Sequence, residues 1–354
     1  MNILERYIGK AVLVGSIIVM LVLLTLLGVF ELVKELDDVG VGSYTTSDAM
    51  VSALLTLPRK LFEVFPVTAL VGSLLGLGTL ASNGELTAMR AAGVSVHSIV
   101  IAVLKTGFFM LVFVFLIGEF VGPVSESYVR KVKVEKQQQA ITLKSKHGFW
   151  ARDGNEYVNI RKILPGSQLE DIYIYEVDAD KQLKLATHAR SATYVDGKWT
   201  LQGIEQTSLQ QEPIRSRSVG SASWGSMIDP DLLSIIVVEP AMLPAWGLYN
   251  YMSFMKQNGQ DATLYQVAFW TKIVTPLTTV VMLFLAVPFV LGSLREVGVG
   301  QRVFVGTLIG TVFYALNQSF SYMSIIYNLE PALATSLPAL VMFFAGLWYL
   351  RRID

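Results

Sequence analysis

The chain has 354 residues, of which 53% are hydrophobic and 16% charged, and its mean hydropathy is +0.50. An ordinary soluble protein is about a quarter charged, so this composition predicts an integral membrane protein. The 28 basic residues balance the 28 acidic residues and form no polybasic tract, which argues against nucleic acid as a partner. Cysteine is absent, which excludes disulfides, thiolate metal sites and a cysteine nucleophile.

Two long apolar segments open the chain. Residues 11–33 carry no charge before Glu31, and a helix of that length crosses a hydrocarbon core of roughly 30 Å. No small-residue cleavage site follows the charged N-terminus, so we interpret this segment as a retained first span rather than a removed signal peptide. Residues 48–60 have apolar side chains at helical spacing and predict an interfacial helix, and residues 61–80 predict the second span.

A short polar island, Ser82–Val94, separates the second span from the third. Ser82 and Glu85 match a capping box, in which a serine hydroxyl and a glutamate carboxylate bond the free amides of the first helical turn. Gly93 is the residue type that most easily adopts the left-handed conformation at a helix end. The island therefore predicts a short helix, and a helix this short needs a surface to lie against.

The third span is predicted at residues 99–121, with Lys105 near one end and Glu119 near the other. Beyond Pro123 the sequence becomes charged and rich in turns, which predicts a soluble domain at residues 125–260.

The local pattern of this domain is that of β-structure. Asp153-Gly154-Asn155 and Asp196-Gly197 each stand between alternating segments, which is a strong hairpin signal. Strands at this spacing indicate an all-β sandwich, jelly roll or open barrel, and the spacing alone does not choose among them. The predicted strands are residues 148–152, 157–161, 172–177, 183–187, 192–195 and 199–204.

A helical pattern returns after Pro240 and Pro244. Residues 245–258 predict a short helix leading back to the membrane, and three further spans follow. The predicted fold is a membrane protein with six transmembrane helices, three on each side of an inserted all-β domain. The last three spans are predicted at 268–291, 303–326 and 332–350, and the three parts of the chain at 1–124, 125–260 and 261–354.

The lysines and arginines of the short loops set the orientation, because cytoplasmic loops carry an excess of them. One side has Lys34, Arg59 and Lys60 among acidic neighbours. The other side, which we therefore place in the cytoplasm, carries Arg6, Lys10, Arg90, Arg295, Arg302, Arg351 and Arg352. Both termini and the Ser82–Val94 helix are then cytoplasmic, and the β domain is periplasmic in a bacterium with two membranes.

The motifs of common enzymes are absent from the sequence. There is no P-loop to hold a nucleotide phosphate, no H-E-x-x-H zinc motif and no G-x-S-x-G nucleophile elbow. His97, His147 and His188 lack metal-ligand spacing, so we expect no metal site. The chain is therefore not expected to be an enzyme in its own right.

Four segments together resemble the LptF/LptG permeases of the lipopolysaccharide exporter of Gram-negative inner membranes: Glu5–Lys10, Glu85–Gly93, Gly148–Gly154 and Gly259–Asp261. The resemblance covers essentially the whole chain and implies a periplasmic β-jellyroll. It also implies a second, LptF-like permease half, two LptB-like ATPase subunits, an LptC-like bitopic protein and lipopolysaccharide as substrate. ATP and magnesium would be bound by the ATPase, so no cofactor is expected in this chain. We expect the LptG-type subunit, with the LptF-type as the alternative.

The resemblance gives the Ser82–Val94 helix a role, because family members insert this segment into a groove of the ATPase. It implies that Glu85 contacts the ATPase, with Arg90 as a second polar contact and Met89 beside them. The alternative for Glu85 is that it only closes the capping box, and the two roles are compatible.

Lipid A phosphates require cations, and the family carries basic contacts just outside span three, which implies this role for Arg130 and Lys133. Lys34 and Lys272 are further candidates. Interfacial snorkelling is the alternative for Lys34, and an internal ion pair with Glu119 or Glu31 is the alternative for Lys272. The gate for the lipid is expected on spans one and five, with plain helix packing as the alternative for each residue: Leu26, Phe30, Phe313, Tyr314 and Phe320.

Two other classes of protein remain as alternatives. A membrane-anchored sensor needs an intracellular signalling module, and the cytoplasmic segments here are too short for one. A stand-alone secondary lipid transporter is expected to place charges near the bilayer midplane, whereas the charges here cluster at the span ends.

Overall fold

The protein is described by a computed structural model that covers residues 2–137, 141–142, 149–153, 155–164, 168–178, 182–195, 198–210, 215–225, 240–257, 261–292 and 297–352. Within these ranges six helices are long and apolar enough to cross a membrane: Ile3–Leu36, Thr46–Ser82, Val96–Gln137, Thr263–Leu291, Val299–Tyr327 and Pro331–Leu350. An antiparallel sheet is inserted between the third and fourth of them, which confirms the predicted fold class.

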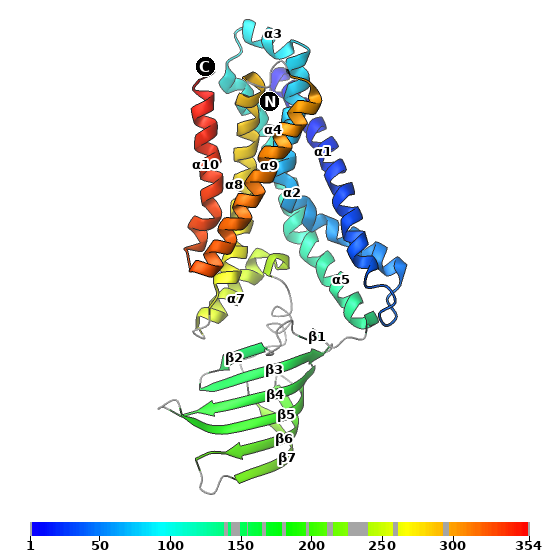
Figure 1. The fold of residues 1–354 in the computed structure, drawn as a ribbon, viewed down its shortest axis with the longest axis vertical. Helices are drawn as coiled ribbons and strands as arrows, with labels where there is room; N and C mark the ends of the chain where they lie inside the picture. The colour runs from blue at the N-terminus through cyan, green and yellow to red at the C-terminus, as the bar shows by residue number, and fades with distance from the viewer. Residues whose placement is uncertain are drawn as a thin grey trace.

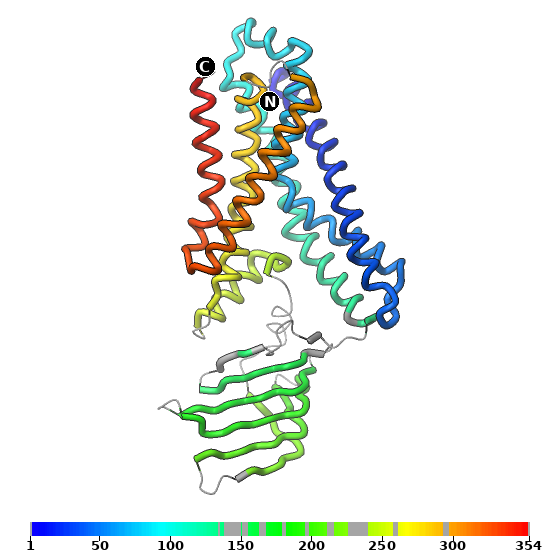
Figure 2. Tube along the Cα trace, in the orientation of Figure 1, coloured from blue at the N-terminus to red at the C-terminus, as the bar shows by residue number. Residues whose placement is uncertain are grey.

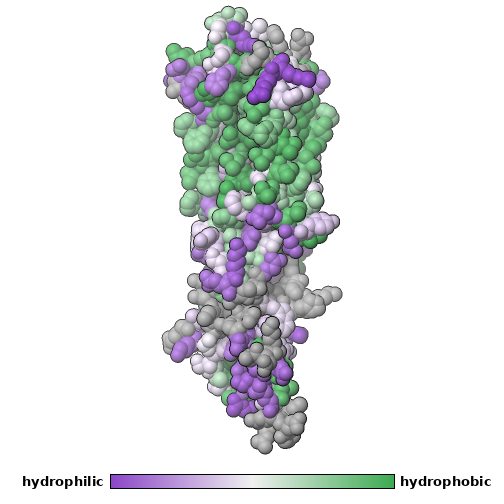
Figure 3. Space-filling view, turned by 90° about the vertical axis from the view of Figure 1, so that its left-hand side faces the viewer, coloured by the Kyte–Doolittle hydropathy of each residue, from purple (hydrophilic) through white to green (hydrophobic). Residues whose placement is uncertain are grey.

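The helices stand side by side, and the sheet lies beyond one end of them (Figure 1). Both termini lie at the opposite end, together with the short helix α3 (Glu85–Ala91), as the chain trace shows (Figure 2). The surface over the helices is an apolar belt with polar residues above and below it (Figure 3). This is the surface expected of a bundle that spans a bilayer once per helix.

The first two spans, α1 (Ile3–Leu36) and α2 (Thr46–Ser82), cross at very short range. A Cβ atom added at Gly72 would come within 2.3 Å of Ser16 Cα, and one added at Gly76 within 2.2 Å of the Ala11 carbonyl oxygen. Glycine is therefore required at both positions, because two helix backbones approach closely only where side chains are missing.

The prediction of a separate interfacial helix at residues 48–60 is wrong. This segment is the first part of α2, which begins with a capping box between Thr45 and Asp48 and continues to Ser82. The helix contains Pro58 and Pro66 in its interior, and such residues bend helices. Figure 1 shows α2 changing direction along its length, so its first part leaves the bundle with the outer half of α1.

The predicted start of the short helix between the second and third spans is also wrong. Ser82 is the last residue of α2, and its hydroxyl donates to the Thr79 carbonyl oxygen at 2.9 Å. Helix α3 begins at Glu85, and the residue before it is Gly84 with φ +77°. The apolar pattern of α2 continues through Leu80, which leaves Asn83 and Gly84 as the turn. The predicted end is confirmed, since Gly93 has φ +90°.

The third span does not end at Pro123. Helix α4 (Val96–Leu116) passes through one turn of π-helix, η1 (Ile117–Val121), into α5 (Gly122–Gln137), which extends beyond the expected boundary at residue 125. A proline near the start of α5 is tolerated because the wider turn of η1 precedes it. The charged composition of α5 therefore belongs to a helix rather than to the sheet domain.

The sheet has seven strands in the described residues, in the order β1-β3-β4-β5-β6-β7, with β2 also paired to β3. The predicted hairpins are confirmed, because Asp153 pairs with Glu156 and Val195 with Lys198. The two strands predicted at 183–187 and 192–195 form one long strand, β5, since the polar residues between them stay in register with β4. The bounds are β1 Ile141–Thr142, β2 Phe149–Asp153, β3 Glu156–Leu164, β4 Gln168–Val177, β5 Leu183–Val195, β6 Lys198–Ser208 and β7 Arg215–Trp224.

The sheet and the helices have separate apolar cores. One face of the sheet buries a cluster that includes Trp199, Ile160 and Leu169. The largest core of the helices lies toward the end that carries α3 and joins α1, α2, α4 and α8. The chain returns to the membrane through η2 (Pro240–Met242) and α7 (Ala245–Gln257), followed by α8 (Thr263–Leu291), α9 (Val299–Tyr327) and α10 (Pro331–Leu350).

Candidate functional site

A cavity of about 580 Å³ lies between the spans in the half of the bundle nearer the sheet. Its walls come from α2, the start of α5, α8 and α9, and η2 closes part of it with Pro240 and Met242. The volume is within the range of sites that hold small ligands or parts of larger ones. Its position beside η2 places it next to the segment that connects the sheet to the membrane helices.

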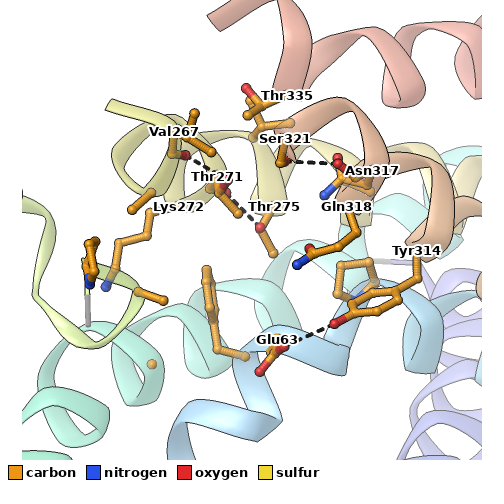
Figure 4. Close-up of a pocket in the computed structure, with 18 of the residues that line it drawn as sticks. Glu63, Val267, Thr271, Lys272, Thr275, Tyr314, Asn317, Gln318, Ser321 and Thr335 are labelled. Carbon is orange, nitrogen blue, oxygen red and sulfur yellow. Dashed lines mark hydrogen bonds between the residues drawn. The ribbon is translucent and has the colours of Figure 1, made fainter. Parts of the chain in front are cut away.

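Polar side chains gather on the α8 and α9 walls of this cavity (Figure 4). The hydroxyls of Thr271 and Thr275 donate to carbonyl oxygens one turn back in α8, at 2.8 and 2.7 Å, and so are satisfied within the helix. Gln318 lines the cavity and is exposed to it, and its side-chain amide has no hydrogen-bond partner in the described part of the chain. An amide inside a membrane bundle is costly unless it bonds to something, so this cavity is suited to water or a polar ligand.

Tyr314 connects α9 to α2 on the opposite wall of the cavity. Its hydroxyl donates to Glu63 Oε1 across the cavity, at the long distance of 3.5 Å (Figure 4). Glu63 also lies 3.3 Å from Lys60 Nζ and 3.7 Å from Arg59 Nη1. The carboxylate is therefore balanced by cations on its own helix, and its contact with Tyr314 is the weaker one.

Lys272 forms an ion pair with Glu119 at 2.8 Å, and the exposed fractions of the two side chains are only 12% and 13%. The second oxygen of Glu119 accepts a hydrogen bond from the backbone N–H of Ala245, at the start of α7. Glu119 lies in the π-helical turn η1, so this turn presents one carboxylate to both α7 and α8. Of the two internal partners expected for Lys272, Glu119 is confirmed, whereas Glu31 bonds Lys34 at 3.2 Å.

Lys133 and Arg59, at the same end of the bundle, are also paired with carboxylates. Lys133 lies 2.8 Å from Glu35 and 3.0 Å from Asp38, so α5 is joined to the end of α1. Arg59 Nε donates to Glu126 at 2.7 Å, which joins α2 to α5. Carboxylates therefore already bond Lys34 and Lys133, two of the cations predicted for lipid phosphates, and a phosphate has to compete with them.

Arg130 lies on α5 at the rim of the cavity. Its Nη2 is 3.2 Å from the sulfur atom of Met242, and Met242 lines the cavity. Lys272 thus lines the cavity and Arg130 contacts one of its lining residues, Met242. Lys34 lies at the outer end of α1 and Lys133 on α5, and neither lines the cavity.

The five residues predicted for the gate fall into different surroundings. Phe313 is buried at 5% exposure and lines the cavity together with Tyr314. Leu26 and Phe30 are more than half exposed on the outer part of α1. Phe320 is partly buried on α9 and is not among the residues that form the cavity wall.

Helix α3 presents its polar residues at the other end of the bundle. Leu86 is buried at 2% exposure in the main core, and Met89 packs against that core. Arg90 is exposed. Glu85 accepts hydrogen bonds from the Tyr7 hydroxyl at 2.6 Å and from the Asn83 side-chain amide at 3.2 Å. These bonds lower the pKa of the Glu85 carboxyl below its usual range, with the Tyr7 hydroxyl as the main cause.

Comparison with known proteins decides the family. A sequence profile described as lipopolysaccharide export system permease LptF/LptG matches residues 6–352. The chain belongs to the LptF/LptG family. The lipopolysaccharide export system permease protein LptG of Haemophilus influenzae is 34% identical over 353 residues, covering 99% of both chains. The LptG protein of Escherichia coli is 33% identical over 354 residues, covering 99% of this chain and 98% of the relative.

Membership confirms the predicted family and function: this permease belongs to the lipopolysaccharide export system, and both relatives carry the LptG name. Six apolar helices and the family together support a multi-pass protein of the inner membrane.

Sequence reasoning missed several polar residues of this LptF/LptG permease. Thr271, Thr275 and Thr278 recur every three to four residues on α8, and Gln318 faces them from α9. This spacing places hydroxyls on one face of an apolar helix and is visible in the sequence. Tyr7 was missed for a different reason, because its partner Glu85 is 78 residues away and no local pattern connects them.

Proposed function

We propose that this permease is the non-catalytic, lipid-handling half of an ATP-driven exporter. It takes lipopolysaccharide laterally from the outer leaflet of the inner membrane and passes it to its periplasmic sheet domain. The observation that carries the proposal is the arrangement along the bundle. The cavity lies at the end next to the sheet, and α3 lies at the opposite end with its polar side exposed.

The orientation follows from the same arrangement together with the loop charges. Both termini and α3 share one end of the bundle, and that end carries Arg90, Arg302, Arg351 and Arg352. An excess of arginine and lysine marks the cytoplasmic side, so we place α3 in the cytoplasm and the sheet in the periplasm. An ATPase in the cytoplasm can then reach α3, and the sheet can reach other periplasmic domains.

The cavity suits the chemistry of the substrate. Apolar residues such as Phe313 and Val67 form much of its wall and accommodate acyl chains, whereas Gln318 and Asn317 offer amides to the sugar and its acyl linkages. Arg130 and Lys272 lie beside the cavity and are the cations proposed for the lipid phosphates. Since the Glu119 carboxylate already bonds Lys272, a phosphate contact at that residue requires exchange of partners.

The proposed complex contains an LptF-like permease half, two LptB-like ATPase subunits and an LptC-like bitopic protein. ATP and magnesium are bound by the ATPase, because this sequence contains no P-loop. In the proposed cycle the ATPases close on ATP, α3 transmits the movement to the spans, and the cavity collapses. The lipid then moves onto the sheet, and the outermost of its described strands, such as β7, suit continuation into a neighbouring β domain.

One experiment tests the coupling role of α3. Glu85→Ala, in the complex reconstituted into proteoliposomes, is expected to lower both lipid release and recovery of the ATPase subunit on purification. Ser82→Ala is the matched control, because the Ser82 hydroxyl bonds within α2 and does not cap α3. Unchanged lipid release and assembly in Glu85→Ala would show that α3 is not the coupling element.

A second experiment tests the cavity. A photo-reactive phenylalanine derivative at position 314 is expected to cross-link lipopolysaccharide, and the cross-link should weaken on addition of ATP. Phe344, which is 63% exposed on α10, is the matched control for lipid that only surrounds the protein. Equal, ATP-independent cross-linking at both positions would refute the assignment of the cavity to the substrate.

A further inference from the structure

Neutral hydrogen-bond donors, rather than a cation, bond the carboxylate of Glu85. Glu5, two residues before Tyr7 on α1, forms an ion pair with Lys105 at 2.7 Å. Glu85 is instead bonded by two neutral donors, the Tyr7 hydroxyl and the Asn83 amide, and no cation of the described residues lies within ion-pair distance of it. Neutral donors fix the direction of a carboxylate without cancelling its charge.

We propose that Tyr7 is a positioning residue for Glu85 and makes the first span a direct part of the coupling path. This inference rests on the proposed role of Glu85 in contacting the ATPase. The Tyr7 hydroxyl holds the carboxylate in one direction and leaves its negative charge available to a cation of the partner. Tyr7 lies on α1, so a displacement of α3 moves the end of α1 through this hydrogen bond.

Packing reinforces the connection between α1 and α3. Leu86 of α3 and Ile8 of α1 are both nearly fully buried in the main core. Tyr7 itself is 49% exposed and Ile3 is 90% exposed, so the first turns of α1 stand at the surface beside α3. The docking surface for the ATPase therefore consists of α3 together with the N-terminal turns of α1.

The geometry of α1 converts this link into movement at the periplasmic end. Backbone contacts at Gly15 and Ser16 hold α1 against Gly72 and Gly76 of α2 and act as a pivot. At 1.5 Å per residue, Tyr7 is about 12 Å from Gly15, and Phe30 is about 22 Å beyond Gly15. A displacement of Tyr7 is thus roughly doubled at the outer part of α1. Val29 and Phe30 lie there and are more than half exposed.

Tyr7→Phe is the direct test, because it removes the hydroxyl and keeps the ring. In the reconstituted complex we expect the lipid released per ATP hydrolysed to fall roughly five- to tenfold, the scale of one hydrogen bond to a charged group at a partly exposed site. Tyr7→Phe combined with Glu85→Gln should be no worse than Glu85→Gln alone. Tyr249→Phe, an exposed tyrosine on α7, is the matched control and should leave the ratio unchanged.

A distance measurement separates coupling from simple stability. The chain has no native cysteine, so within it spin labels attach only at introduced positions, here Val29→Cys on α1 and Ile326→Cys on α9. The permease is labelled before it is assembled with its partners. The change in label distance on adding ATP is expected to shrink by at least half in Tyr7→Phe, following the loss of the link at one end of the pivot.

The outcomes are distinguishable. If Glu85→Gln itself changes neither lipid release nor ATPase assembly, the proposed coupling role of α3 fails. If Glu85→Gln impairs export while Tyr7→Phe leaves the release ratio and the label movement at wild-type values, only the inference about Tyr7 and α1 fails.

Discussion

The ion pair between Lys272 and Glu119 leads to the sharpest prediction about stability. Removing one partner of a buried ion pair costs about 3–5 kcal/mol, because the remaining charge stays buried. The side chains here are 12% and 13% exposed, so we take the lower end, about 3 kcal/mol for Lys272→Met. Glu119→Gln retains an acceptor for the Ala245 N–H but leaves the ammonium group without its carboxylate, and should cost a similar amount.

The double variant tests whether the unpaired buried charge causes the loss of stability in the single variants. Glu119→Gln with Lys272→Met removes both charges, and its cost should be at least about 2 kcal/mol smaller than the sum of the two single costs. Equilibrium unfolding in mixed micelles with increasing SDS, followed by tryptophan fluorescence, measures these differences. Lys131→Met is the control, since the pair Lys131–Glu135 is 74% and 58% exposed and should contribute within about 0.5 kcal/mol. Additive single costs would refute the reasoning.

Two further predictions concern packing and pH. Gly76→Ala should lower the free energy of unfolding by about 1–3 kcal/mol in the same assay, because its Cβ would meet the Ala11 carbonyl oxygen of α1 at 2.2 Å. Gly300→Ala is the control and should leave the free energy of unfolding unchanged, because its Cβ meets nothing within 4 Å. Hydrogen bonds from the Thr263 hydroxyl and N–H lower the pKa of the Asp261 carboxyl from its ordinary 3.8. Because the folded pKa is depressed, this carboxylate stabilises the fold at neutral pH and the contribution is lost as pH falls through the folded pKa. The stability difference between wild type and Asp261→Asn should therefore close on acidification below about pH 4 and persist at pH 7, and a difference that stays constant over this range would contradict it.

The spans were predictable because each is a long apolar run, and the hairpins because Asp-Gly dipeptides mark their turns. The predictions that were wrong concern helix ends, where a short motif conflicts with the pattern of the longer segment around it. Ser82 matches a capping box, but the apolar pattern of α2 continues past Leu80, so the helix does not stop in time for Ser82 to cap the next one. Pro123 signals an end of a helix, but the π-helical turn before it allows the helix to continue.

Part of the candidate site was also predictable from the sequence. A lysine one turn inside a span usually needs a partner, so the sequence predicts either a substrate contact for Lys272 or an ion pair with Glu119 or Glu31. The structure shows the pair with Glu119. Which carboxylate bonds Lys133 was not predictable, because Glu35 is 98 residues away and only tertiary structure brings it close. Contacts of that kind depend on how helices cross, which periodicity does not determine.

The distribution of polar contacts indicates which parts of the permease move together. Lys133 joins α5 to Glu35 of α1 at 2.8 Å, and Arg59 of α2 bonds Glu126 of α5 at 2.7 Å. The exposed fractions of the side chains are 28% and 8% in the first pair and 21% and 8% in the second, so water screens these pairs only weakly. The outer parts of α1, α2 and α5 are thus held as one body. Across the cavity, in contrast, Tyr314 of α9 reaches Glu63 of α2 at 3.5 Å, a distance at which a hydrogen bond contributes little. Movement that opens or closes the cavity therefore requires less free energy between this body and α9 than within the body.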